Sequence, residues 1–395
     1  MTIRSLKLSL LAGLAIVAGA CSSGATPSPT TAPATTTPTA AASGSAEASG
    51  SPAGSLKALK VGVVTDVGTV NDKNFNEYSY KGAQAGAADI GTTGDVPFAV
   101  PKDASEYATL IQNYVSQNFD VIVTVGFNLT ADTVKAAKAN PNIWFIGVDQ
   151  APICVDEKGD PDSTFACKGD AKSLLPHYVA LGYAEDQAGY LAGIVAASVS
   201  QSGTIGAIGG ITICAPCVRY IQGYELGAKS INPSIVVKSA YVTTSDFKKA
   251  FADPVTGKTF GKQFIQQNNP DVLFQVAGLT GNGVLDAACD AGIWGIGVDV
   301  DQFLSYPNAK KCLITSAEKH LASSVEQTIK AIAAGTQQPG DSKFDATNDG
   351  IGVSPGHDNA SKWPADLQGK LDQALAGMKD GSVKTCPENC GAPPG

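Results

Sequence analysis

Histidine and clustered positive charge are both scarce in this 395-residue chain. The three histidines, His177, His320 and His357, lie away from every cysteine pair at ligand spacing, so we expect no zinc site and no other metal or cofactor. None lies in the candidate loops identified below, and we find no Ser/His/Asp or Cys/His arrangement, which argues against an enzyme. The formal net charge is −8 without a basic cluster, which argues against nucleic acid as a partner.

The first 20 residues have the layout of an export signal. Arg4 and Lys7 precede an apolar run over residues 8–20, which is too short to span a bilayer as a helix. Small residues stand directly before Cys21, so the segment resembles a bacterial lipoprotein signal, in which this cysteine becomes the lipidated first residue of the mature chain. We therefore expect a protein on the extracytoplasmic face of the cell membrane, held there by its lipid anchor.

Residues 21–55 are predicted to form a disordered tether. After the cysteine, the stretch SSGATPSPTTAPATTTPTAAASGSAEASGSPAGS holds no aromatic or large aliphatic residue, so it cannot bury enough apolar surface to offset chain entropy. The remainder, about 340 residues, exceeds a comfortable single core and indicates two lobes of ordinary domain size.

The cysteines other than Cys21 are even in number, which in an exported chain indicates disulfides. They fall into couples that are close in sequence: Cys154 with Cys167, Cys214 with Cys217, Cys289 with Cys312, and Cys386 with Cys390. The CAPC stretch at 214–217 fits either a short structural disulfide or a redox-active pair with a lowered thiol pKa. We expect the structural disulfide.

Short apolar runs alternate with helical patterns through the rest of the chain. The runs include KVGVV (60–64), VPFAV (96–100), VIVTVG (121–126), IWFIGVD (143–149), TIGAIGG (204–210), IVVKSAYV (235–242), VLFQVAG (272–278) and WGIGVD (294–299). Continuous Val/Ile runs predict parallel strands buried on both faces by helices. The pattern predicts an α/β protein with two doubly wound lobes, separated near residues 150–175, and a ligand crevice at the carboxyl ends of the strands.

Acids and aromatics gather directly after these predicted strands. Asp66, Asp72, Asp149 and Asp299 sit at or beyond strand ends, in TDVGTVNDKNF, GVDQ and GVDVDQ. Phe75 and Phe127 stand close by, and carboxylates suit sugar hydroxyls while aromatic faces suit flat rings. Taken singly, each acid is more often a helix N-cap or turn residue than a ligand contact, and Phe75 is more often a core or staple residue.

Together, these stretches resemble the basic membrane lipoprotein family, the PnrA-like substrate-binding proteins of ABC importers. The resemblance begins at TDVGTVNDKNFNE and continues in order through YLAGIVAA, GAIGG, RYIQGYELGAK, ADPVTGK, FQVAGLTGNGVLDAA, GVDVDQ and ITSAEK. It implies a periplasmic-binding-protein type I fold, with two parallel-sheet lobes joined by a three-strand hinge. It further implies lobe 1 over 56–170 and 302–338, lobe 2 over 171–301 and 339–380, and a Cys/Pro-rich tail over 381–395.

The same resemblance implies a purine nucleoside between the lobes and ABC permease subunits as partners of a monomer. Carried over onto this chain, the base stacks on Phe75 and the ribose hydroxyls meet Asp299. The full expected ligand set is Asp66, Asn71, Asp72, Phe75, Phe127, Asp149, Gly278, Asp299 and Lys319. Family members stack a second aromatic from the other lobe on the base, but AGLTGNG offers none. Leu279, Phe127 and Phe274 are the candidates here.

Two other functions fit the same residues. A free sugar such as ribose would use the same acids but place less demand on Phe75. A sensor or adhesin would bind the nucleoside without transport, and no motif separates it from an importer. A calcium-dependent nucleoside hydrolase is disfavoured, because Asp66 and Asp72 lack the clustered DxDxxxDD pattern that such chemistry needs.

Overall fold

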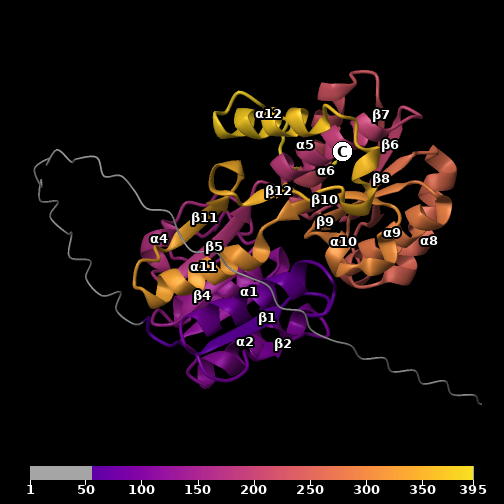
Figure 1. Ribbon diagram of the computed structural model, residues 1–395. Helices are drawn as coiled ribbons and strands as arrows, with labels where there is room; N and C mark the ends of the chain where they lie inside the picture. Colours follow the sequence, from indigo (N-terminus) through magenta and orange to yellow (C-terminus); the bar gives the residue numbers. More distant parts are fainter. Residues whose placement is uncertain (1–55, 395) are drawn as a thin grey trace, which may run out of the picture. The chain divides into compact units, whose positions relative to one another are not determined.

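Two six-stranded sheets, one in each lobe, organise the chain in the computed structural model, which describes residues 56–394 (Figure 1). The predicted signal, the predicted lipidation site Cys21 and the predicted tether lie outside the described residues. The lobe 1 sheet has the order β11-β5-β4-β3-β1-β2, and the lobe 2 sheet has the order β12-β10-β9-β8-β6-β7. No helix among residues 56–394 is long and apolar enough to cross a membrane.

All strand pairs of the lobe 1 sheet are parallel. Its strands are β1 (Val61–Thr65), β2 (Phe98–Ala99), β3 (Val121–Val125), β4 (Trp144–Val148), β5 (Tyr178–Tyr183) and β11 (Gly340–Phe344). The helices that accompany it are α1 (Phe75–Asp89), α2 (Tyr107–Ser116), α3 (Thr130–Ala139), α4 (Ala171–Leu174) and α11 (Leu321–Ala333). Strands β1 and β3 are buried along their whole length, which the continuous Val/Ile runs predicted.

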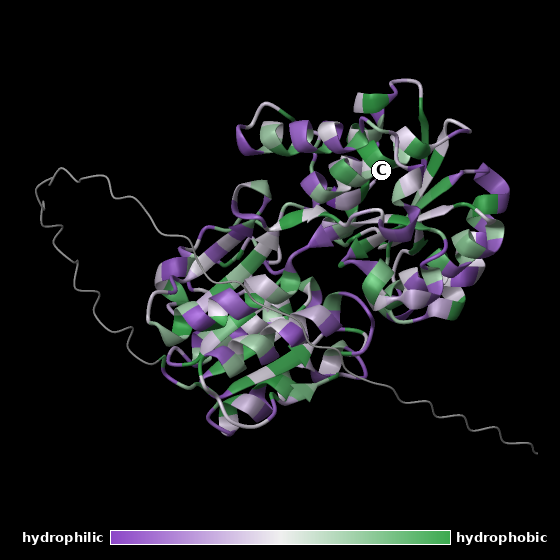
Figure 2. Cartoon of the chain, viewed as in Figure 1, coloured by the Kyte–Doolittle hydropathy of each residue, from purple (hydrophilic) through white to green (hydrophobic). Residues whose placement is uncertain are grey.

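The lobe 2 sheet is parallel except for β12, which pairs antiparallel with β10. Its strands are β6 (Thr204–Ile211), β7 (Val236–Thr243), β8 (Val272–Val276), β9 (Trp294–Asp299), β10 (Leu313–Lys319) and β12 (Ile351–Val353). Its helices are α5 (Glu185–Val199), α6 (Ala215–Ile231), α7 (Phe247–Phe251), α8 (Pro254–Asn268), α9 (Gly278–Ala291), α10 (Gln302–Ser305) and α12 (Leu367–Lys379). Apolar residues concentrate in the central strands of both sheets (Figure 2).

The chain crosses between the lobes later than the sequence predicted at each of three points. Strand β5 pairs with β4 in lobe 1, β10 pairs with β9 in lobe 2, and β11 pairs with β5 in lobe 1. The expected boundaries after residues 170, 301 and 338 are therefore wrong, because each assigns one strand to the opposite lobe. The crossings follow β5, β10 and β11, so three connections join the lobes, as expected.

Helices α5 and α6 pack against each other through glycine. A Cβ atom on Gly189 would lie 2.1 Å from the Tyr220 carbonyl oxygen, and one on Gly223 would lie 2.0 Å from the Asp186 carbonyl oxygen. Only a residue without a side chain permits this approach. The contact holds α6, which carries Tyr220 toward the cleft, at a fixed distance from the start of α5.

All four predicted disulfides are present: Cys154–Cys167, Cys214–Cys217, Cys289–Cys312 and Cys386–Cys390. The last lies in the C-terminal tail, which packs on lobe 2. Thr385 of the tail hydrogen-bonds Asp186, and the Gly391 N–H donates to the Gln222 side chain at 2.8 Å.

Candidate functional site

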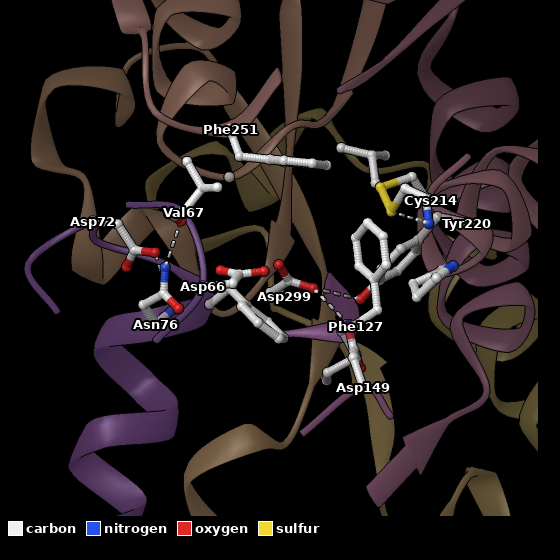
Figure 3. A pocket seen from close by; sticks show the side chains of 16 residues that line it. Asp66, Val67, Asp72, Asn76, Phe127, Asp149, Cys214, Tyr220, Phe251 and Asp299 are labelled. Atoms are coloured by element: carbon white, nitrogen blue, oxygen red, sulfur yellow. Dashed lines mark hydrogen bonds and ion pairs between the residues drawn. A yellow bond between two sulfur atoms is a disulfide. The ribbon is translucent and has the colours of Figure 1, made fainter. Parts of the chain in front are cut away.

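A cavity between the lobes brings most of the predicted ligand residues together (Figure 3). It holds about 540 Å³ of empty space, part of it open to solvent. Eight predicted residues line it: Asp66, Asp72, Phe75, Phe127, Asp149, Gly278, Asp299 and Lys319. Asn71 does not line this cavity, because its side chain is exposed on the loop before α1.

The side chain of Lys319 is the buried centre of the site. Its Nζ lies 2.7 Å from Asp149 Oδ2, 3.4 Å from Asp299 Oδ1 and 3.5 Å from Glu185 Oε1. Lys319 ends β10, so the ammonium joins a carboxylate of lobe 1 to one of lobe 2 at the second crossover. The Nζ also lies 5.0 Å from the centre of the Phe75 ring, within cation–π range.

Two further groups complete the charge network around Lys319. Arg219 on α6 donates from Nε to Glu185 Oε2 at 2.7 Å. Tyr220 donates its hydroxyl proton to Asp299 Oδ1 at 3.2 Å. The cluster is negative overall, because Asp149, Glu185 and Asp299 face only the two cations Lys319 and Arg219.

Burial raises the pKa of the acids that line the cavity. It raises the pKa of Asp149 to about 6, although the charge of Lys319 opposes this, and it also raises the pKa of Asp299. Burial acts to lower the pKa of Lys319, but the charges of Asp149, Asp299 and Glu185 outweigh it and keep the ammonium charged. The site thus offers carboxylate acceptors whose charge is only partly balanced.

Asp149 and Asp299 occupy matching places in the two lobes. Each stands at the end of a buried strand, β4 or β9, with a positive φ, +60° and +64° respectively. Aspartate tolerates this left-handed conformation better than most residues, and such strain concentrates at functional sites. Oδ1 of Asp149 is buried and has no hydrogen-bond partner among the described residues. Asp149 itself lines the cavity, so a ligand that reached this oxygen would find an acceptor with no hydrogen bond from residues 56–394.

Asp66 lies at the end of β1, directly against Gly126. A Cβ on Gly126 would lie 2.0 Å from Asp66 Oδ2, so only glycine fits there, at a φ of +112°. Burial, followed by the charges of Asp149 and Asp72, raises the pKa of Asp66 well above its ordinary value. A carboxyl group that keeps its proton both donates and accepts a hydrogen bond.

Asp72 is engaged mainly by its own loop. Its Oδ1 accepts from the backbone N–H groups of Asn74 and Glu77, and its Oδ2 accepts from that of Asn76. These bonds cap the start of α1, and the ligand contact expected of Asp72 stays a prediction. Asn76, which sequence reasoning missed, also lines the cavity, and its buried Oδ1 has no hydrogen-bond partner among the described residues.

Besides Tyr220, three phenylalanine rings line the cavity: Phe75 and Phe127 from lobe 1 and Phe251 from lobe 2. Phe251, at the end of α7, was not among the candidates for a second aromatic. Of those candidates, Phe274 is wrong because it is fully buried in the lobe 2 core, and Leu279 lines a neighbouring cavity instead. Figure 3 shows Phe251 and Asp299 directed into the same space.

The lobes also touch beside the cavity. Asn282 Nδ2 on α9 donates to the Asp72 carbonyl oxygen at 3.1 Å, and the Ser305 hydroxyl donates to the Lys73 carbonyl oxygen at 2.7 Å. Asn282 Oδ1 is held in turn by the buried side chain of Gln302 at 2.9 Å. The loop that opens α1 is therefore fastened to lobe 2 as well as to its own lobe.

The Cys214–Cys217 disulfide forms part of the cavity wall, together with Pro216. Cys214 caps α6, since its Sγ accepts from the Cys217 backbone N–H at 3.2 Å. The disulfide thus shapes the first turn of the helix that carries Arg219 and Tyr220 into the site.

Comparison with known proteins gives consistent matches. The family profile described as "ABC transporter substrate-binding protein PnrA-like" matches residues 59–374. The "ABC transporter nucleoside-binding protein BmpA" of Lactococcus lactis is 31% identical over 262 residues, 63% of this chain and 66% of that protein. The "CD4+ T-cell-stimulating antigen" of Listeria innocua is 28% identical over 348 residues, 84% and 88% of the two chains. An ABC transporter solute-binding protein from Aeropyrum pernix K1 shares the fold, with a TM-score of 0.69 at 23% identity over 82% of this chain and 92% of that one.

Proposed function

The chain belongs to the PnrA-like family of ABC transporter substrate-binding proteins, and we propose that its ligand is a purine nucleoside held between the two lobes. The predicted family and the predicted two-lobe fold are both confirmed. Proteins of this family bind ligands and work with ABC permeases, and substrate-binding proteins are not enzymes. The specific ligand is the part that we infer from the cavity.

The observation that carries the proposal is the pairing of aromatic rings with a lysine-centred carboxylate cluster in one cavity. Phe75 and Phe251 line the cavity from different lobes, and a flat base between them would be covered on both faces. Stacking on an aromatic ring contributes about 1–3 kcal/mol per base. A free sugar would give these rings much less flat surface to cover, so the rings favour a nucleoside over ribose.

The carboxylates supply the sugar side of the proposed complex. Asp299 is held in place by Tyr220 and Lys319, and Asp149 Oδ1 is an acceptor without a partner among residues 56–394. Two hydroxyl groups of a ribose would donate to these oxygens. A phosphate group would meet a cluster that is already negative, so a neutral nucleoside fits better than a nucleotide.

Asp66 and Asn76 supply polar groups for the edge of the base. The raised pKa of Asp66 allows its carboxyl group to donate as well as accept, and Asn76 Oδ1 accepts only. A purine edge presents both kinds of group. The choice among guanosine, inosine and adenosine depends on which of these groups the base complements.

Lobe closure links binding to delivery. A ligand that touches both lobes stabilises the closed arrangement by its differential affinity for that arrangement, which a permease then recognises. In the proposed cycle, the protein acts as a monomer on the extracytoplasmic face, anchored through lipid on Cys21, and hands the nucleoside to permease subunits. The name of the Lactococcus lactis relative, a nucleoside-binding protein, supports this choice of ligand.

A thermal-shift screen of the purified protein against purine nucleosides, free bases and pentoses tests the proposal. A saturating ligand should stabilise the protein by about 2.7 kcal/mol at a hundredfold excess over Kd. We expect the shift with a purine nucleoside, and its loss in Asp299→Asn, which keeps a side chain suited to the positive φ. A shift with ribose and none with any nucleoside would replace the nucleoside by a sugar.

A further inference from the structure

A second cavity opens beside the ligand cavity and shares Phe127, Asp149 and Pro216 with it. This side pocket holds about 1220 Å³ of empty space, including the part open to solvent. In lobe 1 it is lined by the start of α3 and by the Cys154–Cys167 loop, and in lobe 2 by the start of α6. Asp149 stands at the junction, where its Oδ1 is buried and has no partner among residues 56–394.

The walls of the side pocket are mostly apolar and come from both lobes. Lobe 1 contributes Phe165 from the Cys154–Cys167 loop, and lobe 2 contributes Ile213 from the turn before α6. The two residues are 81% and 55% exposed, and they differ from other exposed apolar residues of the chain, such as Val255, in that both line the same pocket.

The loop that carries Phe165 is built to keep its shape. Besides the disulfide, a β-bridge joins Val155 to Pro161, and Asp162 accepts from the backbone N–H groups of Thr164 and Cys167. This ordering means that the exposed ring of Phe165 is presented by a fixed scaffold.

The charges around the side pocket disfavour an anion there. Asp149 and Asp162 are both in its lining, and hydrogen bonding, chiefly from Thr164, lowers the pKa of Asp162. The single arginine in the lining, Arg219, is already paired with the buried carboxylate of Glu185 at 2.7 Å. A neutral, apolar group therefore suits this space better than a phosphate.

We propose that the side pocket receives an apolar substituent on the 5′ carbon of the bound nucleoside, so that the natural ligands include 5′-substituted nucleosides. This inference rests on the proposed function. In the proposed complex the base lies between Phe75 and Phe251, and the 2′ and 3′ hydroxyls bind Asp299 and Asp149. The 5′ carbon is then the remaining position of the sugar from which a substituent can extend away from these contacts. Phe127 and Pro216 line both cavities beside Asp149, so a 5′ substituent would pass along this shared wall into the side pocket.

Calorimetric titration of a matched ligand series tests this proposal. The probes are the purine nucleoside with the largest thermal shift and its 5′-methylthio, 5′-butylthio and 5′-phosphate derivatives. A fully buried methylene raises affinity about fourfold, so three methylenes in a half-open pocket should raise it about tenfold from methylthio to butylthio. The phosphate should bind more weakly than the parent nucleoside.

Variants of the side-pocket walls test whether the higher affinity of the butylthio derivative comes from this pocket or from nonspecific hydrophobic binding. Phe165→Asn, which suits the φ of +55° there, and Ile213→Thr should abolish the butylthio gain and leave the affinity for the parent nucleoside unchanged. Val255→Ala is the matched control, because Val255 is 76% exposed on lobe 2 and lines neither cavity. In that variant the gain should persist.

Three results would overturn the inference: equal or falling affinity along the thioether series, tighter binding of the 5′-phosphate, or a butylthio gain that survives both wall variants. Failure of every unsubstituted nucleoside to bind would instead refute the proposed function itself. The parent nucleoside in each titration keeps these two failures distinguishable.

Discussion

Replacing Lys319 by methionine should destabilise the protein far more than the same change at a surface lysine. Methionine keeps the length of the side chain but leaves Asp149, Asp299 and Glu185 without the ammonium that lies 2.7, 3.4 and 3.5 Å from them. Removing one partner from a buried ion pair costs about 3–5 kcal/mol, because the remaining charge is buried without compensation. We expect a loss of that size in the free energy of unfolding at pH 7.5.

The loss should shrink as the solution becomes more acidic. Burial already raises the pKa of Asp149 to about 6 and raises that of Asp299, and without Lys319 both values rise further. A carboxyl group with a raised folded-state pKa binds more protons in the folded than in the unfolded state. These two carboxyl groups therefore stabilise the variant increasingly as the pH falls through their raised folded-state pKa values toward about 4, where the unfolded carboxyl groups titrate.

Urea denaturation at pH 7.5 and pH 5 measures both effects. Lys330→Met is a matched control, because Lys330 lies the same 2.7 Å from Asp89 but both side chains are about two-fifths exposed. An exposed pair is screened by solvent, so this control should change little at either pH. If Lys319→Met lowers the free energy of unfolding no more than the control does, or if its loss is the same at both pH values, the electrostatic account of the site is refuted.

Three further predictions concern binding. Phe251→Ala should weaken nucleoside binding about 5- to 150-fold in calorimetry and leave ribose binding unchanged, while Phe247→Ala, which lines only the neighbouring cavity, should be nearly neutral. Affinity should fall about tenfold per pH unit below about 6, as Asp149 gains a proton, and Asp149→Asn should flatten that profile. Replacing Cys214 and Cys217 by serine should weaken binding with little change in unfolding, because so short a loop constrains the unfolded chain little. The same replacement in the C-terminal tail should leave binding unaffected.

The strand-end residues could be predicted because the geometry of a parallel sheet is simple. Each Val/Ile run ends at the same edge of its sheet, so Asp66, Asp149 and Asp299 converge without any knowledge of side-chain packing. The disulfides could be predicted equally well, because two cysteines that are close in sequence are close in space in almost any fold.

Phe251 could not be predicted in this way. It does not follow a strand directly, because β7 ends at Thr243 and the five-residue helix α7 intervenes. Tyr220 lies within α6 and reaches Asp299 only because glycines let α6 pack closely on α5. Both contacts depend on tertiary packing, which leaves little local signal.

The lobe boundaries were misplaced for a related reason. β5 (YVALGY) and β10 (LITSAEK) are the last strands before their crossovers. No residue in either strand indicates which of the two sheets it joins. Pairing with β4 and β9, the strands that directly precede them in the chain, decides that, and this pairing is a tertiary contact.

A crystal structure of the protein with its best-binding purine nucleoside tests the central claim most directly. The account predicts the base between Phe75 and Phe251, with two ribose hydroxyls within hydrogen-bonding distance of Asp299 and Asp149. A nucleoside bound outside this cavity, or a base that touches neither phenylalanine, would contradict it.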